Sequence, residues 1–130
     1  MASRRIRRYA PHAVLANVLA PLPHLERFES AGLCYLLHCL PGAMAEKSAV
    51  FDHLARWLAP GARVFGATIV QGDVPRSRPA QVLMDLYNRK GIFSNADDSV
   101  QALDLELRGR FRDVEIALKG SVALFEARAP

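Results

Sequence analysis

Two apolar runs separated by an amphipathic stretch dominate the pattern of the chain between residues 28 and 72. The runs, FESAGLCYLLHCLPG and GARVFGATIVQG, are rich in residues that suit burial on both faces of a sheet. The stretch AEKSAVFDHLARWLAP repeats apolar residues at helical spacing, with charged residues mainly on the other side: Glu46, Lys47, Asp52 and Arg56. This order predicts a parallel strand–helix–strand unit with a right-handed crossover, strands over 28–37 and 63–70, and a helix over 43–58 that Pro60-Gly61 ends.

Weaker patterns predict elements on both sides of this unit. Residues 2–9 are compatible with a helix, and the apolar run HAVLANVL over 12–19, bounded by prolines, favours a buried strand. Beyond residue 72, one apolar stripe predicts a helix that ends before Gly91: Val82, Leu83, Leu86 and Tyr87. A second stripe predicts another helix: Val100, Leu103, Leu107 and Phe111.

Local signals mark the start of that last helix and the end of the chain. Ser94 with Asp97, or Asn95 with Asp98, has the spacing of a helix cap, in which a short polar side chain accepts from the first-turn amides. The β-prone runs DVEIAL and VALFEAR flank a turn through Gly120. They predict a terminal antiparallel hairpin.

Length and composition indicate one domain. With 130 residues, 51% of them hydrophobic, the chain can bury a core without disulfides. No apolar run approaches the roughly 20 residues of a membrane helix, and no continuous secretory segment follows the first residues, so we expect a cytoplasmic protein. Cys34 and Cys39 match no zinc or redox spacing, and we expect no metal site.

The formal charge of +4 comes largely from the first residues, since four of the 17 basic side chains lie there: Arg4, Arg5, Arg7 and Arg8. A short basic run can bind nucleic acid, but it is equally typical of a solvated helix face. No aromatic residue beyond Tyr9 interleaves with it. We therefore do not expect nucleic-acid binding.

The order of elements resembles the second half of class I S-adenosylmethionine (SAM) dependent methyltransferases. FESAGLCYLLHCLPG with KSAVFDHLARWLAPGARVFGAT looks like the fourth strand, its loop, the next helix and the fifth strand of small-molecule methyltransferases. LYNRKGIFSNADDS looks like the helix and loop that follow in one bacterial branch. The terminal hairpin separates this family from dinucleotide-binding Rossmann domains. The resemblance covers residues 2–128 and implies an α/β fold: a truncated Rossmann-like class I methyltransferase sheet with a C-terminal antiparallel hairpin.

Part of the family pattern has no counterpart between residues 1 and 130. The family holds SAM with a glycine-rich turn after its first strand and with an acidic residue at the end of its second strand. This chain resembles a single partial domain that begins at the third strand of the family fold. The run over 12–19 is then expected to pair directly with the strand over 28–37, to leave the sheet, or to need strands from a partner. An uncovered strand edge also predicts self-association. Alternatively, Met1 is not the true start of the protein.

The resemblance also suggests site residues. His38 follows the first strand of the unit, at the edge where α/β sheets bind ligands, and is the candidate catalytic base; an equally weighted alternative is that it caps the strand or packs over the cofactor. The resemblance implies cofactor-binding residues Asn17, Leu36, Leu37 and His38; an equally weighted alternative for Asn17 is that its side chain satisfies its own backbone at the strand end. It implies acceptor-binding residues Tyr87, Asn88 and Phe93, although Tyr87 also completes an apolar stripe.

Three further histidines, His12, His24 and His53, have no partner pattern and are expected on the surface or in loops. Cys39 is expected to pack as a small residue, since nothing near it in the sequence lowers a thiol pKa.

Two functions from different classes remain. The first is a SAM-dependent methyltransferase of a small molecule, impaired in binding SAM by itself. The second is a non-catalytic remnant or interaction module that pairs with another chain through the sheet edge.

Overall fold

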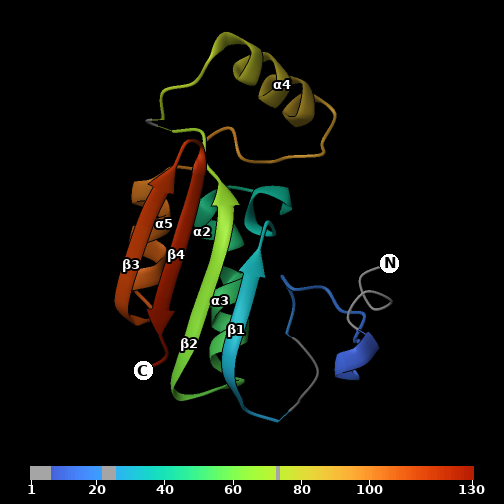
Figure 1. Ribbon diagram of the computed structural model, residues 1–130, viewed down its shortest axis with the longest axis vertical. Coiled ribbons are helices and arrows are strands. Elements are labelled where there is room, and N and C mark those ends of the chain that lie inside the picture. The colour runs from blue at the N-terminus through green and yellow to red at the C-terminus, as the bar shows by residue number, and fades with distance from the viewer. Residues whose placement is uncertain (1–6, 22–25, 73) are drawn as a thin grey trace.

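A four-stranded sheet in the order β1-β2-β4-β3 forms the centre of the computed structural model, which describes residues 7–21, 26–72 and 74–130 (Figure 1). Its strands are β1 (Phe28–Cys34), β2 (Leu58–Ile69), β3 (Arg112–Lys119) and β4 (Val122–Arg128). β1 pairs parallel with β2, whereas β4 lies between β2 and β3 and is antiparallel to both. The predicted parallel unit and the terminal hairpin are both confirmed.

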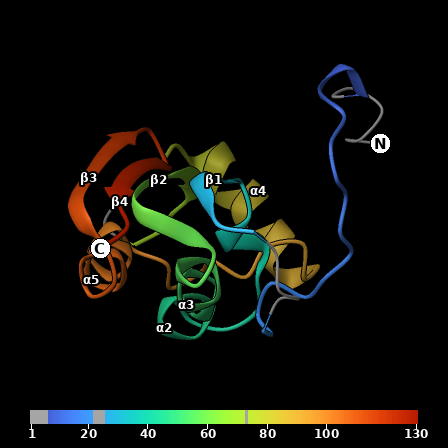
Figure 2. The same ribbon diagram turned by 90° about the horizontal axis from the view of Figure 1, so that it is seen from below.

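The helices lie on one face of the sheet and beyond one of its ends. α2 (Met44–Lys47), α3 (Ala49–Ala55) and α5 (Val100–Arg108) cover one face, as the view along the strands shows (Figure 2). α4 (Arg78–Arg89) stands beyond the carboxyl end of β2 (Figure 1), and no described residue of it is buried. Two 3₁₀ turns complete the described elements: η1 (Arg7–Tyr9) and η2 (Leu37–Cys39).

The core lies between the sheet and its covering helices. The ring of Phe51, fully buried on α3, makes edge-to-face contacts with Phe111 (5.9 Å between centroids) and Phe125 (6.2 Å). Leu103 and Leu107 of α5 are also fully buried, as the apolar stripe predicted. Burial of these apolar groups holds the helices against the sheet.

The predicted helix over 43–58 is wrong in its extent. It is interrupted at Ser48 and ends at Ala55, because Phe28 donates its N–H to Trp57 O (2.6 Å) and pairs with Leu58 as β2 begins. Pro60-Gly61 therefore lies inside β2 and does not end the helix. Gly61 adopts φ +74°, a left-handed conformation that glycine tolerates well.

The predicted strand over 12–19 is also wrong. Residues 10–17 form no regular element and are exposed, with Leu15 fully so, and this segment runs away from the sheet (Figures 1 and 2). Of the three alternatives for it, the structure shows the one in which it leaves the sheet. A strand needs a hydrogen-bonded neighbour, and apolar composition alone does not supply one. Most of the predicted helix over 2–9 lies outside the described residues, which show η1 at its end.

The predicted caps of the last helix are wrong by several residues. Ser99, not Ser94 or Asn95, is the N-cap of α5, and its side chain accepts from Ala102 N at 3.1 Å. Both Asn95 and Asp98 are buried, and their side chains make longer-range contacts.

The two cysteines are free and exposed. In the described part of the chain, no helix has the length and apolar character required to cross a membrane.

Candidate functional site at the carboxyl ends of β1 and β2

His38 lies in η2, a few residues beyond the end of β1, and is 3% exposed. Its Nδ1 accepts the backbone N–H of Ile69 at 3.3 Å and lies 3.3 Å from Thr68 Oγ1. Its carbonyl accepts from Ser94 N at 2.8 Å. His38 thus joins the end of β2 to the loop over residues 92–99.

The surroundings of His38 favour a neutral ring. Desolvation by burial, followed by the nearby ammonium of Lys47, lowers the pKa of His38 below 6.5. Because Nδ1 accepts from a backbone amide, the hydrogen-bond network places the remaining proton on Nε2. This geometry favours the strand-capping alternative, and removal of an acceptor proton by His38 stays a prediction.

His38 belongs to a row of aromatic rings, which we call the aromatic row: Tyr87, Phe93, His38 and Tyr35. Neighbouring centroids lie 5.1 Å (Tyr87–Phe93), 4.7 Å (Phe93–His38) and 5.9 Å (His38–Tyr35) apart, all edge-on. Edge-to-face packing aligns the positive ring edge with the negative ring face. The structure therefore brings together His38, Tyr87 and Phe93 from separate predicted segments, and adds Tyr35, which was not predicted.

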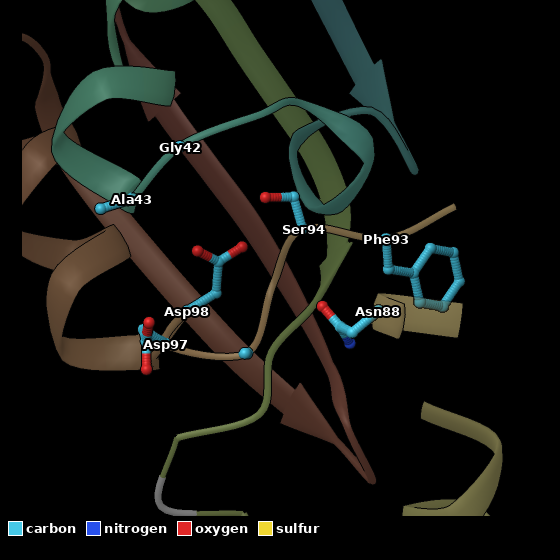
Figure 3. Close-up of a pocket in the computed structure, with 8 residues that line it drawn as sticks. Gly42, Ala43, Asn88, Phe93, Ser94, Asp97 and Asp98 are labelled. Atoms are coloured by element: carbon cyan, nitrogen blue, oxygen red, sulfur yellow. The ribbon is translucent and has the colours of Figure 1, made fainter. Parts of the chain in front are cut away.

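A cleft of about 380 Å³ opens beside this row (Figure 3). Residues from three segments line it: Gly42, Ala43, Asn88, Phe93, Ser94, Ala96, Asp97 and Asp98. Two of the three predicted acceptor-binding residues, Asn88 and Phe93, thus share one cleft, while Tyr87 packs against Phe93. The volume is in the range of small-molecule sites.

A buried ion pair lies under the cleft. Lys47 Nζ is 2.7 Å from Asp98 Oδ2, the side chains are 0% and 1% exposed, and Lys47 also donates to the carbonyl of Ser94. The assignment of Lys47 to the polar helix face is therefore wrong. Burial raises the pKa of Asp98, while the hydrogen bond from Lys47 opposes that shift and favours the carboxylate. The residues are 51 positions apart, so no local pattern signals their contact.

A second polar network fixes α4 to the end of β2. Asn95 is fully buried, and its side chain donates to Ile69 O (2.9 Å) and accepts from Gln71 Nε2 (2.8 Å) and Asn88 Nδ2 (3.0 Å). Gln71 Oε1 in turn accepts from Arg76 Nη1 at 2.7 Å. Both polar atoms of the Asn95 side chain thereby have hydrogen-bond partners, which makes the loop under α4 a defined wall of the cleft.

The predicted cofactor-binding residues do not converge. Asn17 is exposed, and its Oδ1 accepts from the nearby Leu19 N at 3.0 Å, the local role that was the alternative for it. Leu37 is fully buried in the core, and Leu36 packs partly buried against that core. Of this set, only His38 belongs to the aromatic row.

Neither His12 nor His53 lines the cleft. His12 is exposed, and His24 lies outside the described residues. His53 is half-buried on α3, not in a loop, and its Nδ1 has no hydrogen-bond partner among the described residues.

Comparison with known proteins gives close sequence relatives, although no family model matches the chain. It is 38% identical over 126 residues to demethylluteothin O-methyltransferase of Streptomyces thioluteus, covering 96% of this chain and 55% of that protein. It is 36% identical over 130 residues to methyltransferase aurB of Calcarisporium arbuscula, covering 99% of this chain and 56% of that protein. The chain spans about half the length of these relatives.

Solved structures share the fold. An O-methyltransferase family protein from Burkholderia thailandensis matches with a TM-score of 0.71 at 18% identity, over 98% of this chain and 40% of that one. The N-methyltransferase NodS from Bradyrhizobium japonicum WM9, in complex with S-adenosyl-L-homocysteine, matches with a TM-score of 0.62 at 15% identity, over 99% of this chain and 61% of that one. By sequence, the chain is therefore similar to O-methyltransferases and other methyltransferases, and its fold corresponds to a carboxyl-terminal portion of the class I SAM-dependent methyltransferase domain.

Proposed function

We propose that this chain supplies the acceptor side of a SAM-dependent methyltransferase that acts on a small molecule. The observation that carries this proposal is the cleft at the carboxyl ends of β1 and β2, lined by Asn88 and Phe93 and flanked by His38. Ligand sites of α/β sheets lie at this edge. The sequence relatives are O-methyltransferases and other methyltransferases by name, which supports the same reaction class.

Each residue has a proposed role in holding the acceptor. Phe93 forms an apolar wall of the cleft, backed by Tyr87, and the side chain of Asn88 is held at its border by Asn95. In the present arrangement His38 carries its proton on Nε2, and we infer that this N–H donates to an oxygen of a bound acceptor. For His38 to act as the base, its Nδ1 or a deprotonated Nε2 would have to face the acceptor hydroxyl.

The residues described here do not by themselves fit a SAM site. Asn17 is satisfied locally and Leu37 is enclosed in the core, so neither lies in the aromatic row with His38. No glycine-rich turn after a first strand occurs in residues 1–130. We therefore assign no step of methyl transfer to the chain by itself and infer that it binds SAM weakly or not at all.

Calorimetric titration tests the inference about SAM. The chain of 130 residues, titrated with SAM and with S-adenosyl-L-homocysteine, is expected to release no heat of binding at micromolar concentrations. A chimaera that joins the amino-terminal part of the Streptomyces thioluteus relative to this chain is expected to bind both. Micromolar binding of SAM by the chain alone contradicts the inference that the chain binds SAM weakly or not at all. A folded chimaera that fails to bind SAM contradicts the proposed function.

A second candidate function, an interaction module, rests on the uncovered parts of the sheet. β1 is an edge strand of the described sheet. The helices α2, α3 and α5 cover only one face of the sheet and leave the other face uncovered (Figure 2). The side chains of Phe65 and Leu124 are each 41% exposed. An exposed edge beside an apolar face favours pairing with another strand, from a second copy or from a companion chain.

Size-exclusion chromatography with light scattering tests this candidate. Self-association is expected, and Ser30→Glu on the exposed edge strand is expected to reduce it, because a charge on an edge opposes strand pairing. The new carboxylate would lie opposite Arg63 in the β1–β2 register, which keeps the substitution compatible with the fold. A compact monomer at all concentrations, with no companion chain on purification, argues against the module.

A further inference from the structure

The two edge strands of the sheet differ in how well they could accept another strand. Among the described residues, β1 and β3 each have a hydrogen-bonded strand on one side only. β3 carries four charged side chains in its eight residues and a register shift between Arg112 and Glu115. From Ser30 to Cys34, β1 has no charged side chain and keeps a regular register with β2. Charges and bulges on an edge oppose strand addition, so the open edge of β1 is the favoured place for it.

A segment with the composition of a strand lies exposed before β1. Residues 10–17 form no regular element, Leu15 is fully exposed, and Val14 is 45% exposed. No Asp, Glu, Lys or Arg occurs from Tyr9 to Leu25. Residues 12–16 also lack proline, so each of their backbone N–H and C=O groups is available for a ladder. In an extended conformation Val14 and Leu15 point to opposite faces, which suits a strand that is covered on both.

The chain directs this segment away from its own sheet. In the turn that follows the segment, Asn17 O accepts from Ala20 N (3.1 Å) and Asn17 Oδ1 accepts from Leu19 N (3.0 Å). Val18 packs against the hydrophobic core and anchors this turn. The residues before the turn run outward from the sheet (Figure 2). Pairing with β1 of the same chain would require the turn to open, whereas a second copy can approach the segment with the turn intact.

Exchange of the segment between two copies is reciprocal. In a symmetric pair, each copy donates residues 12–16 and accepts the same residues of the other copy at β1, so the contact forms twice and neither edge is left open. The side chains of the two strands are complementary in size. β1 offers small residues at Ala31 and Gly32, and the segment brings the larger Val14 and Leu15.

We infer that residues 12–16 of one copy add as a strand to the open edge of β1 in a second copy, which gives a reciprocal dimer. The inference rests on the interaction module proposed above as the second candidate function. It adds the identity of the partner and the segment that the partner supplies.

Two pairs of variants separate strand addition from nonspecific association. Leu15→Lys replaces an apolar side chain of the segment by a charge, and Leu105→Lys makes the same change on α5, where Leu105 is 71% exposed. Val14→Pro removes a backbone donor from the segment, whereas Val14→Ile keeps the donor and a β-branched side chain. Val14 and Leu15 lie outside every regular element, so their variants are expected to fold, which circular dichroism checks.

Sedimentation velocity over a range of concentrations measures the monomer–dimer equilibrium. The unmodified chain is expected to form a dimer. Leu15→Lys and Val14→Pro are each expected to raise the dissociation constant about tenfold or more, the scale of losing one large buried apolar side chain. Leu105→Lys and Val14→Ile are expected to leave the dissociation constant within about twofold of its original value.

Isotope-filtered nuclear Overhauser effects identify the strands that pair. In a mixture of labelled and unlabelled copies, filtered contacts are expected between residues 12–16 of one copy and residues 30–34 of the other. Contacts between these two segments within one copy would overturn the assignment to a second copy.

A monomer at all concentrations overturns the inference, and so does a dimer that Leu15→Lys or Val14→Pro fails to weaken. A dimer that Ser30→Glu weakens but Leu15→Lys does not would retain the interaction module and exclude residues 12–16 as the strand it binds. The SAM titration of the chimaera tests the methyltransferase function independently of these results.

Discussion

Lys47 Nζ lies 2.7 Å from Asp98 Oδ2 with both side chains withdrawn from solvent, and this pair joins α2 to the loop before α5. Lys47 also donates to the carbonyl of Ser94, which lines the cleft. The pair therefore determines where one wall of the candidate site lies.

Removing one partner of this pair is expected to be severely destabilising. Lys47→Met leaves the Asp98 carboxylate buried without a counter-charge, at a cost of about 3–5 kcal/mol in the free energy of unfolding. The double variant Lys47→Met/Asp98→Leu is expected to lose less than Lys47→Met, since no charge is then left unpaired. Urea denaturation followed by circular dichroism measures both, and additive losses would contradict the coupling.

The free energy of unfolding is expected to fall as the pH drops below 6.5, through His38. Desolvation and Lys47 lower the pKa of His38 in the folded state, whereas the unfolded chain protonates near 6.5. The stability from His38 is therefore complete above pH 6.5 and is lost below it, at no more than about 1.4 kcal/mol per pH unit.

Denaturation at pH 7.5 and 5.5 checks this for the unmodified chain and for His38→Gln. The raised pKa of Asp98 acts in the opposite direction in both proteins, so the difference between them isolates His38. That difference is expected to shrink at pH 5.5. His12→Gln, at an exposed position, serves as the control and is expected to leave the pH dependence unchanged.

Gly66 is expected to tolerate no side chain. A Cβ at this position would meet the carbonyl oxygen of Leu33 on β1 and the ring of Phe125 on β4. Gly66→Ala should therefore cost about 1–3 kcal/mol by overpacking the sheet. Gly109→Ala is the control, since a Cβ there has its nearest contact at 3.4 Å, and it should change stability little. Equal unfolding midpoints for the two variants would disprove this.

Arg110 is expected to stabilise the docking of α5 on α3. Its guanidinium makes a two-point contact with Asp52 (2.7 and 3.0 Å) and a further bond to Glu106 Oε2 (2.6 Å). Arg110→Ala should cost about 1 kcal/mol, less in 1 M NaCl, and Arg110→Lys should restore only part of it. Arg108→Ala removes an exposed ion pair within α5 and a hydrogen bond to Val114 O (3.2 Å), neither of which reaches α3, and should affect this docking less. A loss that does not change with salt would argue against an ionic origin.

Local patterns predicted much of the fold because they report short-range physics. Continuous apolar runs indicated β1 and β2, the turn through Gly120 indicated the hairpin, and the stripe with Leu103 and Leu107 indicated α5. The predictions were wrong where contacts with residues far along the chain determine the local structure. The run over 12–19 has the composition of a strand but finds no neighbour, and Pro60-Gly61 looks like a helix end but lies in a strand paired with β1 and β4.

The candidate site was predictable only in part. His38 could be identified because it follows a predicted strand at the ligand-binding edge of a sheet, whereas Asn88 and Phe93 were implied only by the family resemblance. Lys47 was predicted on the polar face of a helix and Asp98 in a helix cap, because charged residues are normally exposed. Their burial depends on the ion pair between them, which joins residues far apart in the chain. No sequence pattern indicated Tyr35, because the residue type does not specify its left-handed backbone conformation.

By itself, the sequence determined the order and type of most elements, the family resemblance and the absence of a glycine-rich turn within residues 1–130, all of which depend on local composition and spacing. Only the tertiary structure decided which polar groups are buried in pairs, which rings meet in the aromatic row and which segments line the cleft. These outcomes depend on contacts between residues far apart in the chain, where burial and hydrogen bonding outweigh local preference.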